Sequence, residues 1–410
     1  MKNKFWFFLA SHIFVSDKKD RMLLYDTQLG KCLIVVESEP IQLVRRIYED
    51  ENIGSVELSE RDFSVAVIRD FINDVVASGM GQLVDAQQQP IKPVVLLPIL
   101  SLNFDVERFK DKENADAILS KNISKYLLDI NIILNGSCQQ ECIHCGDYCK
   151  QFFCCCKNEH TQSLPKGFLI DLLRQISYFP VQTINLTGGN IYQYEDLDIF
   201  ETLNDNGKKI FNFYVHYQNY QENSVVDRQN IHLMINAPVN VEKLNEVNLL
   251  TRDKKTKYHL IIENEEQYNE LELALSKIGI EDFEVHPFYN GDNLCFFEES
   301  VFLSEEDILA NPISMREIFR NQKMNANSFG SLYILPDGDI KANLNTTVIG
   351  NLKQDRIVDV INYEMMQNTA WRRVRSDEPC LNCVYQYLCP PISNYERVLN
   401  RPNLCHIHKT

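Results

Sequence analysis

Cysteine is concentrated in two short segments of this 410-residue chain. Seven of the thirteen cysteines lie between Cys138 and Cys156, and four more lie between Cys380 and Cys405. An even spread would place only about 0.6 cysteine in the first segment. Clustered cysteines form disulfides in oxidising compartments, whereas in reducing compartments they bind metals or iron-sulfur clusters. The compartment and the bound group therefore decide what this chain does.

The remaining sequence favours reduced thiols in the cytoplasm. The first apolar run, residues 5–10, is too short for the core of a signal peptide. The longest apolar stretch, residues 94–100, is far shorter than the roughly 18 to 20 residues that span a membrane. The odd cysteine count and the contiguous residues 154–156 fit poorly with a disulfide framework. The net charge of −16 argues against a nucleic-acid partner, and we expect no contact with a membrane.

Apolar patterns divide the chain into four parts. Residues 1–95 combine a strand hairpin with helical spacing, which predicts a small winged-helix-like module or a plain structural cap. Residues 96–124 are the predicted linker. Residues 125–300 alternate between strand and helix patterns, which indicates parallel β/α units. In residues 301–410 the alternation of helix and strand ends, a hairpin signal follows at Pro336-Asp337-Gly338, and the last part is loop-rich.

The second part predicts the fold class, which is α/β. A complete eight-unit barrel needs about 250 residues, so the roughly 165 residues available suit an open, partial (β/α)6 barrel. The six expected strands cover residues 126–134, 181–186, 211–217, 231–235, 258–262 and 283–285.

Cys138, Cys142 and Cys145 have the spacing C-x3-C-x2-C directly after the first of these strands. In β/α units, active groups lie in the loops beyond the carboxyl ends of the strands. Three close thiolates can hold three irons of a [4Fe-4S] cube and leave the fourth iron open to a small molecule. Two alternatives stay open, because Cys149 could complete a structural zinc site or a fully ligated cluster. For residues 154–156 we expect packing or an auxiliary role.

In spacing and position this loop resembles that of the radical S-adenosylmethionine (SAM) superfamily. The resemblance implies a partial β/α barrel whose open iron chelates SAM, and a one-electron reduction that splits SAM into methionine and a 5′-deoxyadenosyl radical. Gly188, Gly189 and Asn190, at the end of the second strand, resemble the Gly-Gly-Glu motif that receives the methionine amino group. Because Asn190 replaces the glutamate, this contact lacks charge assistance and is expected to be weaker.

The second cysteine segment contains the set Cys380, Cys383, Cys389 and Cys405. It resembles the SPASM extension of radical SAM peptide-modifying enzymes, which holds two auxiliary [4Fe-4S] clusters. The resemblance implies that these four cysteines are the complete ligand set of the second auxiliary cluster. Asn343 and Ser393 stand where ligands of the first auxiliary cluster would be, so we expect that cluster to be missing. A zinc knuckle on the same four cysteines is the alternative.

The two resemblances together imply a function in the maturation of a ribosomally made peptide. The N-terminal module would bind the leader of a precursor peptide by strand addition, and an electron donor would reduce the open cluster. Two alternatives stay open. One is a catalytically degenerate pseudo-radical-SAM protein that binds peptide and one cluster as the partner of an active radical SAM enzyme. The other is a zinc-stapled binding protein with no redox role.

Outside the cysteines, no side chain stands out as a catalytic acid or base. Glu263, at the end of a strand, is predicted to face the active opening. The basic run Arg372, Arg373 and Arg375 is predicted to form a solvated helix face rather than an anion site. Four histidines fall on predicted strands and are expected to be satisfied core or rim residues: His216, His232, His259 and His286.

Overall fold

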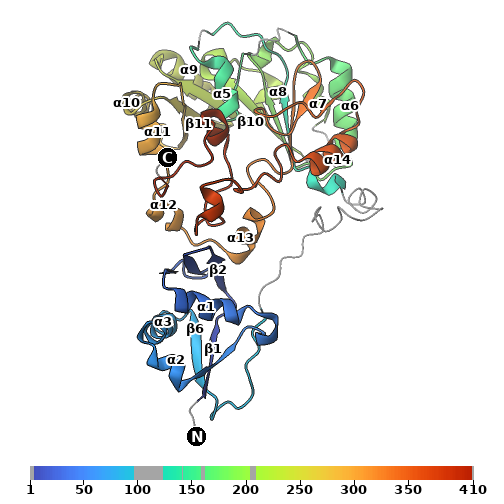
Figure 1. Cartoon of the computed structure of the whole chain (residues 1–410). Helices are drawn as coiled ribbons and strands as arrows, with labels where there is room; N and C mark the ends of the chain where they lie inside the picture. The colour runs from blue at the N-terminus through green and yellow to red at the C-terminus, as the bar shows by residue number, and fades with distance from the viewer. Residues whose placement is uncertain (1–3, 97–122, 141, 158–161, 204–208, 409–410) are drawn as a thin grey trace.

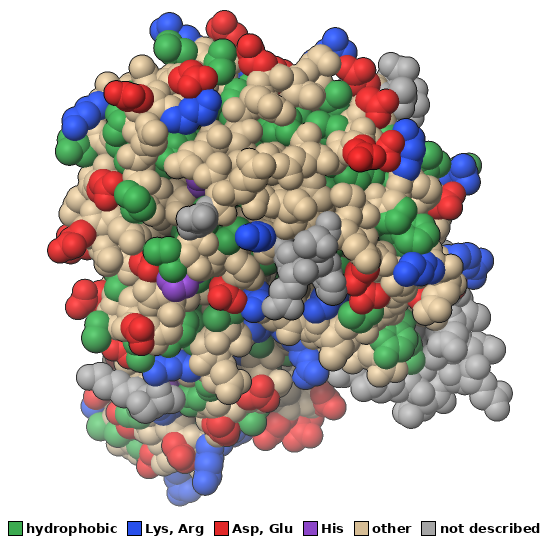
Figure 2. All heavy atoms as spheres, turned by 90° about the horizontal axis from the view of Figure 1, so that it is seen from above, with side chains coloured by type: hydrophobic (Ala, Val, Ile, Leu, Met, Phe, Trp, Pro, Cys, Tyr) green, Lys and Arg blue, Asp and Glu red, His purple; other side chains and the backbone are tan. Residues whose placement is uncertain are grey.

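A computed structural model describes residues 4–96, 123–140, 142–157, 162–203 and 209–408. A small N-terminal domain lies beside a larger α/β domain that carries a C-terminal segment (Figure 1). The predicted linker, residues 96–124, lies almost wholly outside the described residues. No helix in the described ranges combines the length and the apolarity needed to cross a bilayer. On the face seen in Figure 2, acidic and basic side chains are interspersed rather than gathered into a basic patch.

The N-terminal domain contains two three-stranded antiparallel sheets, with the strand orders β5-β1-β6 and β2-β3-β4. Phe7, Val44 and Val75 meet in its core, so helices and strands share one buried cluster. The apolar pattern predicted the hairpin and the helices but missed β5 and β6, which are only four and five residues long. The elements are β1 (Lys4–Leu9), β2 (Ile13–Asp17), β3 (Met22–Asp26), β4 (Cys32–Val35), α1 (Ser38–Ile47), η1 (Asp50–Asn52), β5 (Val56–Ser59), α2 (Glu60–Ser64), α3 (Ala66–Ala77) and β6 (Gly81–Asp85).

The sheet β2-β3-β4 packs against the C-terminal segment. Its Phe14, Leu23 and Tyr25 belong to one buried cluster with residues 383–388. The Tyr25 hydroxyl accepts a hydrogen bond from the Ile313 N–H at 2.9 Å. Lys18 Nζ donates to the Leu381 carbonyl at 2.8 Å and to the Gln386 side chain at 2.6 Å. The N-terminal domain therefore rests on the loop that carries the second cysteine set.

A nine-stranded, mostly parallel sheet forms the centre of the α/β domain, in the order β12-β11-β10-β9-β8-β7-β13-β14-β15. The six predicted strands are all present, and each pairs in parallel with its neighbour in the sequence. β13 joins the other edge of β7, also in parallel. The strands are β7 (Asp129–Ile133), β8 (Thr183–Thr187), β9 (Ile210–His216), β10 (Asn230–Asn236), β11 (Lys255–Ile262), β12 (Phe283–Pro287), β13 (Ser331–Ile334), β14 (Asp339–Lys341) and β15 (Gly350–Asn351).

One face of this sheet is apolar and packs against helices. Ile132, Leu186 and Phe213 belong to the largest buried cluster, to which α6 contributes Leu169, Leu172, Leu173 and Ile176 at helical spacing. The helices of this domain are η3 (Ile123–Tyr126), α5 (Cys145–Gln151), α6 (Lys166–Ile176), η4 (Ile191–Gln193), α7 (Ile199–Leu203), η6 (Tyr217–Asn219), α8 (Ser224–Asp227), α9 (Val241–Thr251) and α10 (Glu265–Lys277).

The opposite face of the sheet is polar, and asparagines form a ladder across it. Asn185 donates to Asn131 at 2.8 Å, Asn212 donates to Asn185 at 2.8 Å, and Asn230 donates to Asn212 at 2.9 Å. These residues are register partners on β7, β8, β9 and β10. A shift of one residue would move every amide to the apolar face, so the ladder helps to specify the register of the strands. We call this the polar face.

The C-terminal segment contains the predicted hairpin, β13 and β14, whose turn places Gly338 at a φ of 90°. One prediction for this segment is wrong, because residues 372–375 form no helix. Helix α14 ends at Gln367, and Asn368 caps it in the left-handed region. The Arg375 side chain is only 10% exposed, since it pairs with Glu396. The helices here are α11 (Leu294–Ser300), α12 (Glu305–Leu309), α13 (Met315–Asn321), α14 (Ile357–Gln367), η7 (Cys380–Asn382) and α15 (Asn394–Leu399).

Candidate functional site

The three cysteines of the C-x3-C-x2-C loop converge at the carboxyl end of β7. Cys138, Cys142 and Cys145 line one small pocket, together with Gly189 from the end of β8 and His216 from the end of β9. Parallel strands bring their carboxyl ends to the same edge of a sheet, which is why these residues from separate segments meet. All thirteen cysteines of the chain are free thiols.

Hydrogen-bond donors surround the sulfur atoms of this loop. Cys138 Sγ accepts from Asn219 Nδ2 at 3.2 Å, and Cys145 Sγ accepts from the Lys157 N–H at 3.0 Å. The Cys142 thiol donates to Cys145, which lowers the pKa of Cys145 and raises that of Cys142. The thiolate is the form of cysteine that binds a metal. The loop therefore stabilises negative charge on Cys145 and favours the protonated thiol at Cys142.

The Gly188-Gly189-Asn190 segment packs directly on the cysteine loop. A Cβ atom on Gly189 would lie 2.3 Å from the Ser137 carbonyl oxygen and 3.0 Å from the Cys138 Cβ. The Asn190 N–H donates to the Ser137 carbonyl at 2.7 Å. Its Oδ1 accepts from the Tyr192 N–H at 3.1 Å and so caps η4. Of the three predicted SAM contacts, Gly189 lines the pocket, whereas the acceptor oxygen of Asn190 already has a partner.

Replacing Gly189 with alanine is expected to displace the cysteine loop and so to lower any iron and sulfide that the chain binds, without removing a cysteine. The new methyl group would overlap the backbone at Ser137, so the cysteine loop must move. Iron and acid-labile sulfide per chain are the measurement, with Gly167→Ala as the control because a Cβ atom there meets nothing within 4 Å. Wild-type iron content in Gly189→Ala would contradict the close packing described here.

Two further cysteines reach the pocket, although the sequence predicted only packing or an auxiliary role for them. Cys154 and Cys155 are buried and line it, and the Cys156 N–H donates to the Gly188 carbonyl at 2.9 Å. Thr187 Oγ1 donates to the Cys154 carbonyl at 2.9 Å, which holds this strip against the end of β8. Cys149 is not among the lining residues. The structure thus brings five of the seven cysteines of the first segment together.

His216 lines the cysteine pocket, and Glu263 lies against the cysteine loop. Burial lowers the pKa of His216, and its Nε2 lies 2.7 Å from Asn236 Oδ1, so the ring is neutral and held. Glu263 accepts from Asn290 Nδ2 at 2.7 Å and lies 3.8 Å from His144 Nε2, within the cysteine loop. Glu263 therefore faces the loop, as its place at a strand end suggested.

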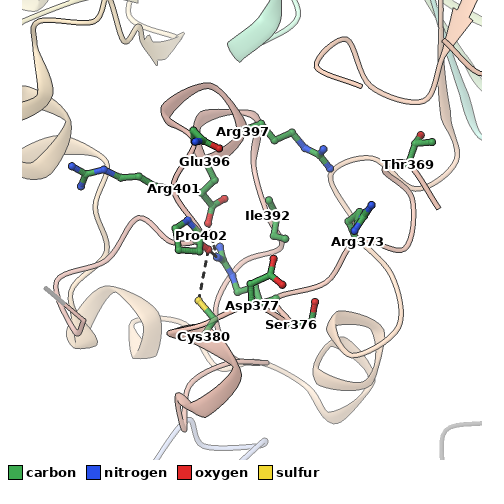
Figure 3. Close-up of a pocket in the computed structure, with 12 residues that line it drawn as sticks. Thr369, Arg373, Ser376, Asp377, Cys380, Ile392, Glu396, Arg397, Arg401 and Pro402 are labelled. Carbon is green, nitrogen blue, oxygen red and sulfur yellow. Dashed lines mark hydrogen bonds and ion pairs between the residues drawn. The ribbon is translucent and has the colours of Figure 1, made fainter. Parts of the chain in front are cut away.

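The second cysteine set gathers around the buried ion pair of Arg375 and Glu396. Burial raises the pKa of the Cys389 thiol to about 12, with further contributions from the charges of the other three cysteines. Arg375 opposes this shift and hydrogen-bonds to Cys380. Figure 3 shows Cys380 and Glu396 lining one pocket with Arg373, Arg397 and Arg401. Asn403 Nδ2 also donates to Cys405 Sγ at 3.1 Å. The four predicted ligands thus lie near one another, and Cys380 and Cys389 lie beside Arg375.

The positions expected to have lost the first auxiliary cluster lie together. Asn343 is buried and donates to the side chain of Asn394 at 2.8 Å, and Asn394 directly follows Ser393. Ser393 begins α15 as part of a capping box with Glu396. Amide hydrogen bonds and a helix cap therefore occupy the place where the resemblance expects thiolates.

The chain was also compared with known proteins. No protein-family model and no curated protein matches it. A solved structure titled "Native anSMEcpe with bound AdoMet" is similar over 64% of this chain and 88% of its own, with a TM-score of 0.44 and 11% sequence identity. Likeness at this level does not assign the chain to a family.

Proposed function

We propose that this chain is a radical SAM iron-sulfur protein of the SPASM class that acts in the maturation of a ribosomally made peptide. One observation carries the proposal: three thiols of a C-x3-C-x2-C loop converge with Gly189 in one pocket, at the carboxyl ends of adjacent parallel strands. The six parallel strands β7 to β12 run in sequence order, as a partial (β/α)6 barrel requires.

The donor set fits a [4Fe-4S] cluster with one open iron. Cys138, Cys142 and Cys145 would hold it, and the N–H groups that point at their sulfurs would stabilise its charge. When bound and reduced, such a cluster supplies the electron that splits SAM. Gly189 allows the β8 loop to approach the cysteines closely enough to share a small molecule. Neutral His216 adds no positive charge that would repel the sulfonium of SAM.

The other parts of the chain fit peptide maturation. Cys380, Cys383, Cys389 and Cys405 would hold one auxiliary cluster beside Arg375. Each sheet of the N-terminal domain ends in edge strands, β5 and β6 in one and β2 and β4 in the other, to which a leader peptide can add as a further strand. An electron donor in the cytoplasm would complete the system.

A second candidate is a pseudo-radical-SAM partner protein that binds peptide and keeps one cluster without cleaving SAM. One observation favours this candidate: the side-chain oxygen of Asn190 accepts a hydrogen bond from the Tyr192 N–H and caps η4. One acceptor position on that oxygen would then be left for the methionine amino group, and it carries no charge. The zinc-stapled alternative rests on the cysteine spacings in the sequence alone.

Anaerobic purification followed by iron and sulfide analysis, then dithionite and SAM, separates these candidates. Two clusters per chain with formation of 5′-deoxyadenosine are expected for the enzyme. Iron without 5′-deoxyadenosine would favour the partner protein and overturn the enzyme. Zinc without iron would overturn both.

A further inference from the structure

Three histidines form a continuous chain of imidazoles on the polar face of the sheet. His232 Nδ1 lies 2.8 Å from His259 Nε2, and His259 Nδ1 lies 2.9 Å from His286 Nε2. The three residues come from β10, β11 and β12, and their rings stack with centroids 5.0 and 5.1 Å apart. His259 is fully surrounded, with a side chain 5% exposed. The sequence analysis predicted only that these histidines are satisfied core or rim residues.

Glu284 on β12 adds a carboxylate to the end of this chain. Its Oε2 lies 3.3 Å from His259 Nδ1 and 4.0 Å from His286 Nε2. With the 2.9 Å between the two nitrogens, these separations leave a point about 2.0 Å from all three atoms, which matches Zn–N and Zn–O bonds of about 2.0 to 2.2 Å. Within the described residues no other three ligand atoms of His, Cys, Asp or Glu lie this close together.

We propose that His259 Nδ1, His286 Nε2 and Glu284 Oε2 bind a divalent first-row transition-metal ion, such as Zn²⁺ or Fe²⁺. Two imidazoles and one carboxylate that leave further coordination positions open are a ligand set that such ions take. The ion replaces the hydrogen bond between the two imidazoles with two metal–nitrogen bonds.

The residues around these ligands hold them in place. A metal on Nδ1 of His259 leaves the proton on Nε2, which donates to His232 Nδ1, as outer partners of metal-bound histidines do. The His232 ring stacks on Tyr214 at 4.4 Å, and the His286 ring stacks on Phe152 at 5.0 Å. Lys257 lies 3.6 Å from the other carboxylate oxygen of Glu284. Oε2 is thus the oxygen that faces the imidazoles.

An ion can reach this site without passing through the cysteine loop. Glu284 has a side chain 55% exposed, and His286 lines a pocket of about 840 Å³ with Tyr395 and Phe296. Ile261, two residues after His259 on β11, lines the cysteine pocket. Two residues of strand cover about 7 Å, so the two sites are neighbours on one face but do not share ligands.

Titration of the full-length protein with Co²⁺ tests the proposal. We expect one Co²⁺ per chain that gives the weak visible bands of nitrogen and oxygen ligation, in addition to any Co²⁺ whose intense near-ultraviolet band marks binding to the thiols of the two cysteine sets. Glu284→Gln, His259→Gln and His286→Gln should each weaken binding at least about tenfold. His406→Gln is the matched control, because His406 is not one of the three proposed ligands. The affinity of this variant for Co²⁺ should equal that of the wild type.

A variant with serine at positions 138, 142 and 145 separates this site from the cysteine loop and should keep the Co²⁺. Loss of binding in that variant, or unchanged binding in all three site variants, would overturn the proposal. Glu284 is exposed, so Glu284→Gln should fold even if a change at buried His259 does not, and circular dichroism checks both. These outcomes are independent of SAM cleavage, so failure of the proposed function leaves the metal result interpretable.

Discussion

Replacing Cys142 with alanine is expected to reduce SAM cleavage to background and to remove about four iron atoms per chain, because a cube held by only two of its three thiolates is not retained. Cys142 lies between Cys138 and Cys145 in the pocket and shares a thiol hydrogen bond with Cys145. Iron held by the proposed C-terminal cluster should persist, since its four predicted ligands lie in a separate segment. Iron content, the cluster absorbance near 400 nm and 5′-deoxyadenosine are the measurements.

Two matched variants sharpen this test. Cys295→Ala removes an exposed thiol at the start of α11 and should leave iron and product unchanged. Cys149→Ala distinguishes an open cluster from a closed one, because Cys149 does not line the pocket and its loss should have no effect. Product formation in Cys142→Ala would show that the open cluster is held elsewhere.

Replacing Arg375 with methionine is expected to lower the free energy of unfolding by about 3 to 5 kcal/mol, the usual result of removing one partner of a buried ion pair. Arg375 and Glu396 lie 2.5 Å apart, with side chains 10% and 3% exposed. Arg375 also donates to the Pro390 carbonyl at 2.8 Å. It thus ties the segment just after Cys389 to α15, the helix that contains Glu396. Without the Arg375 guanidinium, the buried carboxylate of Glu396 has no opposite charge beside it. Urea denaturation is the measurement, and iron content should fall with it.

The double variant Arg375→Met with Glu396→Gln identifies the cause. Glutamine keeps an oxygen for the Ser393 N–H but carries no charge, so most of the lost stability should return. Arg356→Met is the control, because Arg356 and Asp359 form an exposed pair whose loss should cost less than about 1 kcal/mol. If Arg375→Met and Arg356→Met lower the free energy of unfolding by the same amount, the buried ion pair contributes little to stability.

The sequence predicted the six strands and the hairpin because their signals are local. Apolar runs mark strands, and Pro336-Asp337-Gly338 marks a turn, whatever the rest of the chain does. Arg375 was misread for the opposite reason: its neighbours are basic, and Glu396, its partner, lies 21 residues farther along the chain. A run of basic residues in the sequence does not reveal an acidic partner far along the chain. The pattern alone therefore predicted solvent exposure.

The parts of the site that depend on short spacings along the sequence could be predicted. The parts that depend on contacts between distant strands could not. The C-x3-C-x2-C loop and Gly189 could be named from the sequence, and the structure brings them together. The roles of Cys154 and Cys155, the asparagine ladder and the imidazole chain depend on which residues become neighbours across strands. That register is a property of the assembled sheet, and asparagine and histidine give no strand signal of their own.

The contact of Lys18 with the Leu381 carbonyl and the Gln386 side chain has a consequence for how the protein is assembled. Both acceptors belong to the loop between Cys380 and Cys389, so whatever orders this loop also orders the surface on which the N-terminal domain rests. Any group bound by the four cysteines is therefore coupled energetically to domain docking, and by reciprocity docking favours binding of that group. The N-terminal domain, which we propose receives a peptide, is thus held by the same loop that carries the four cysteines.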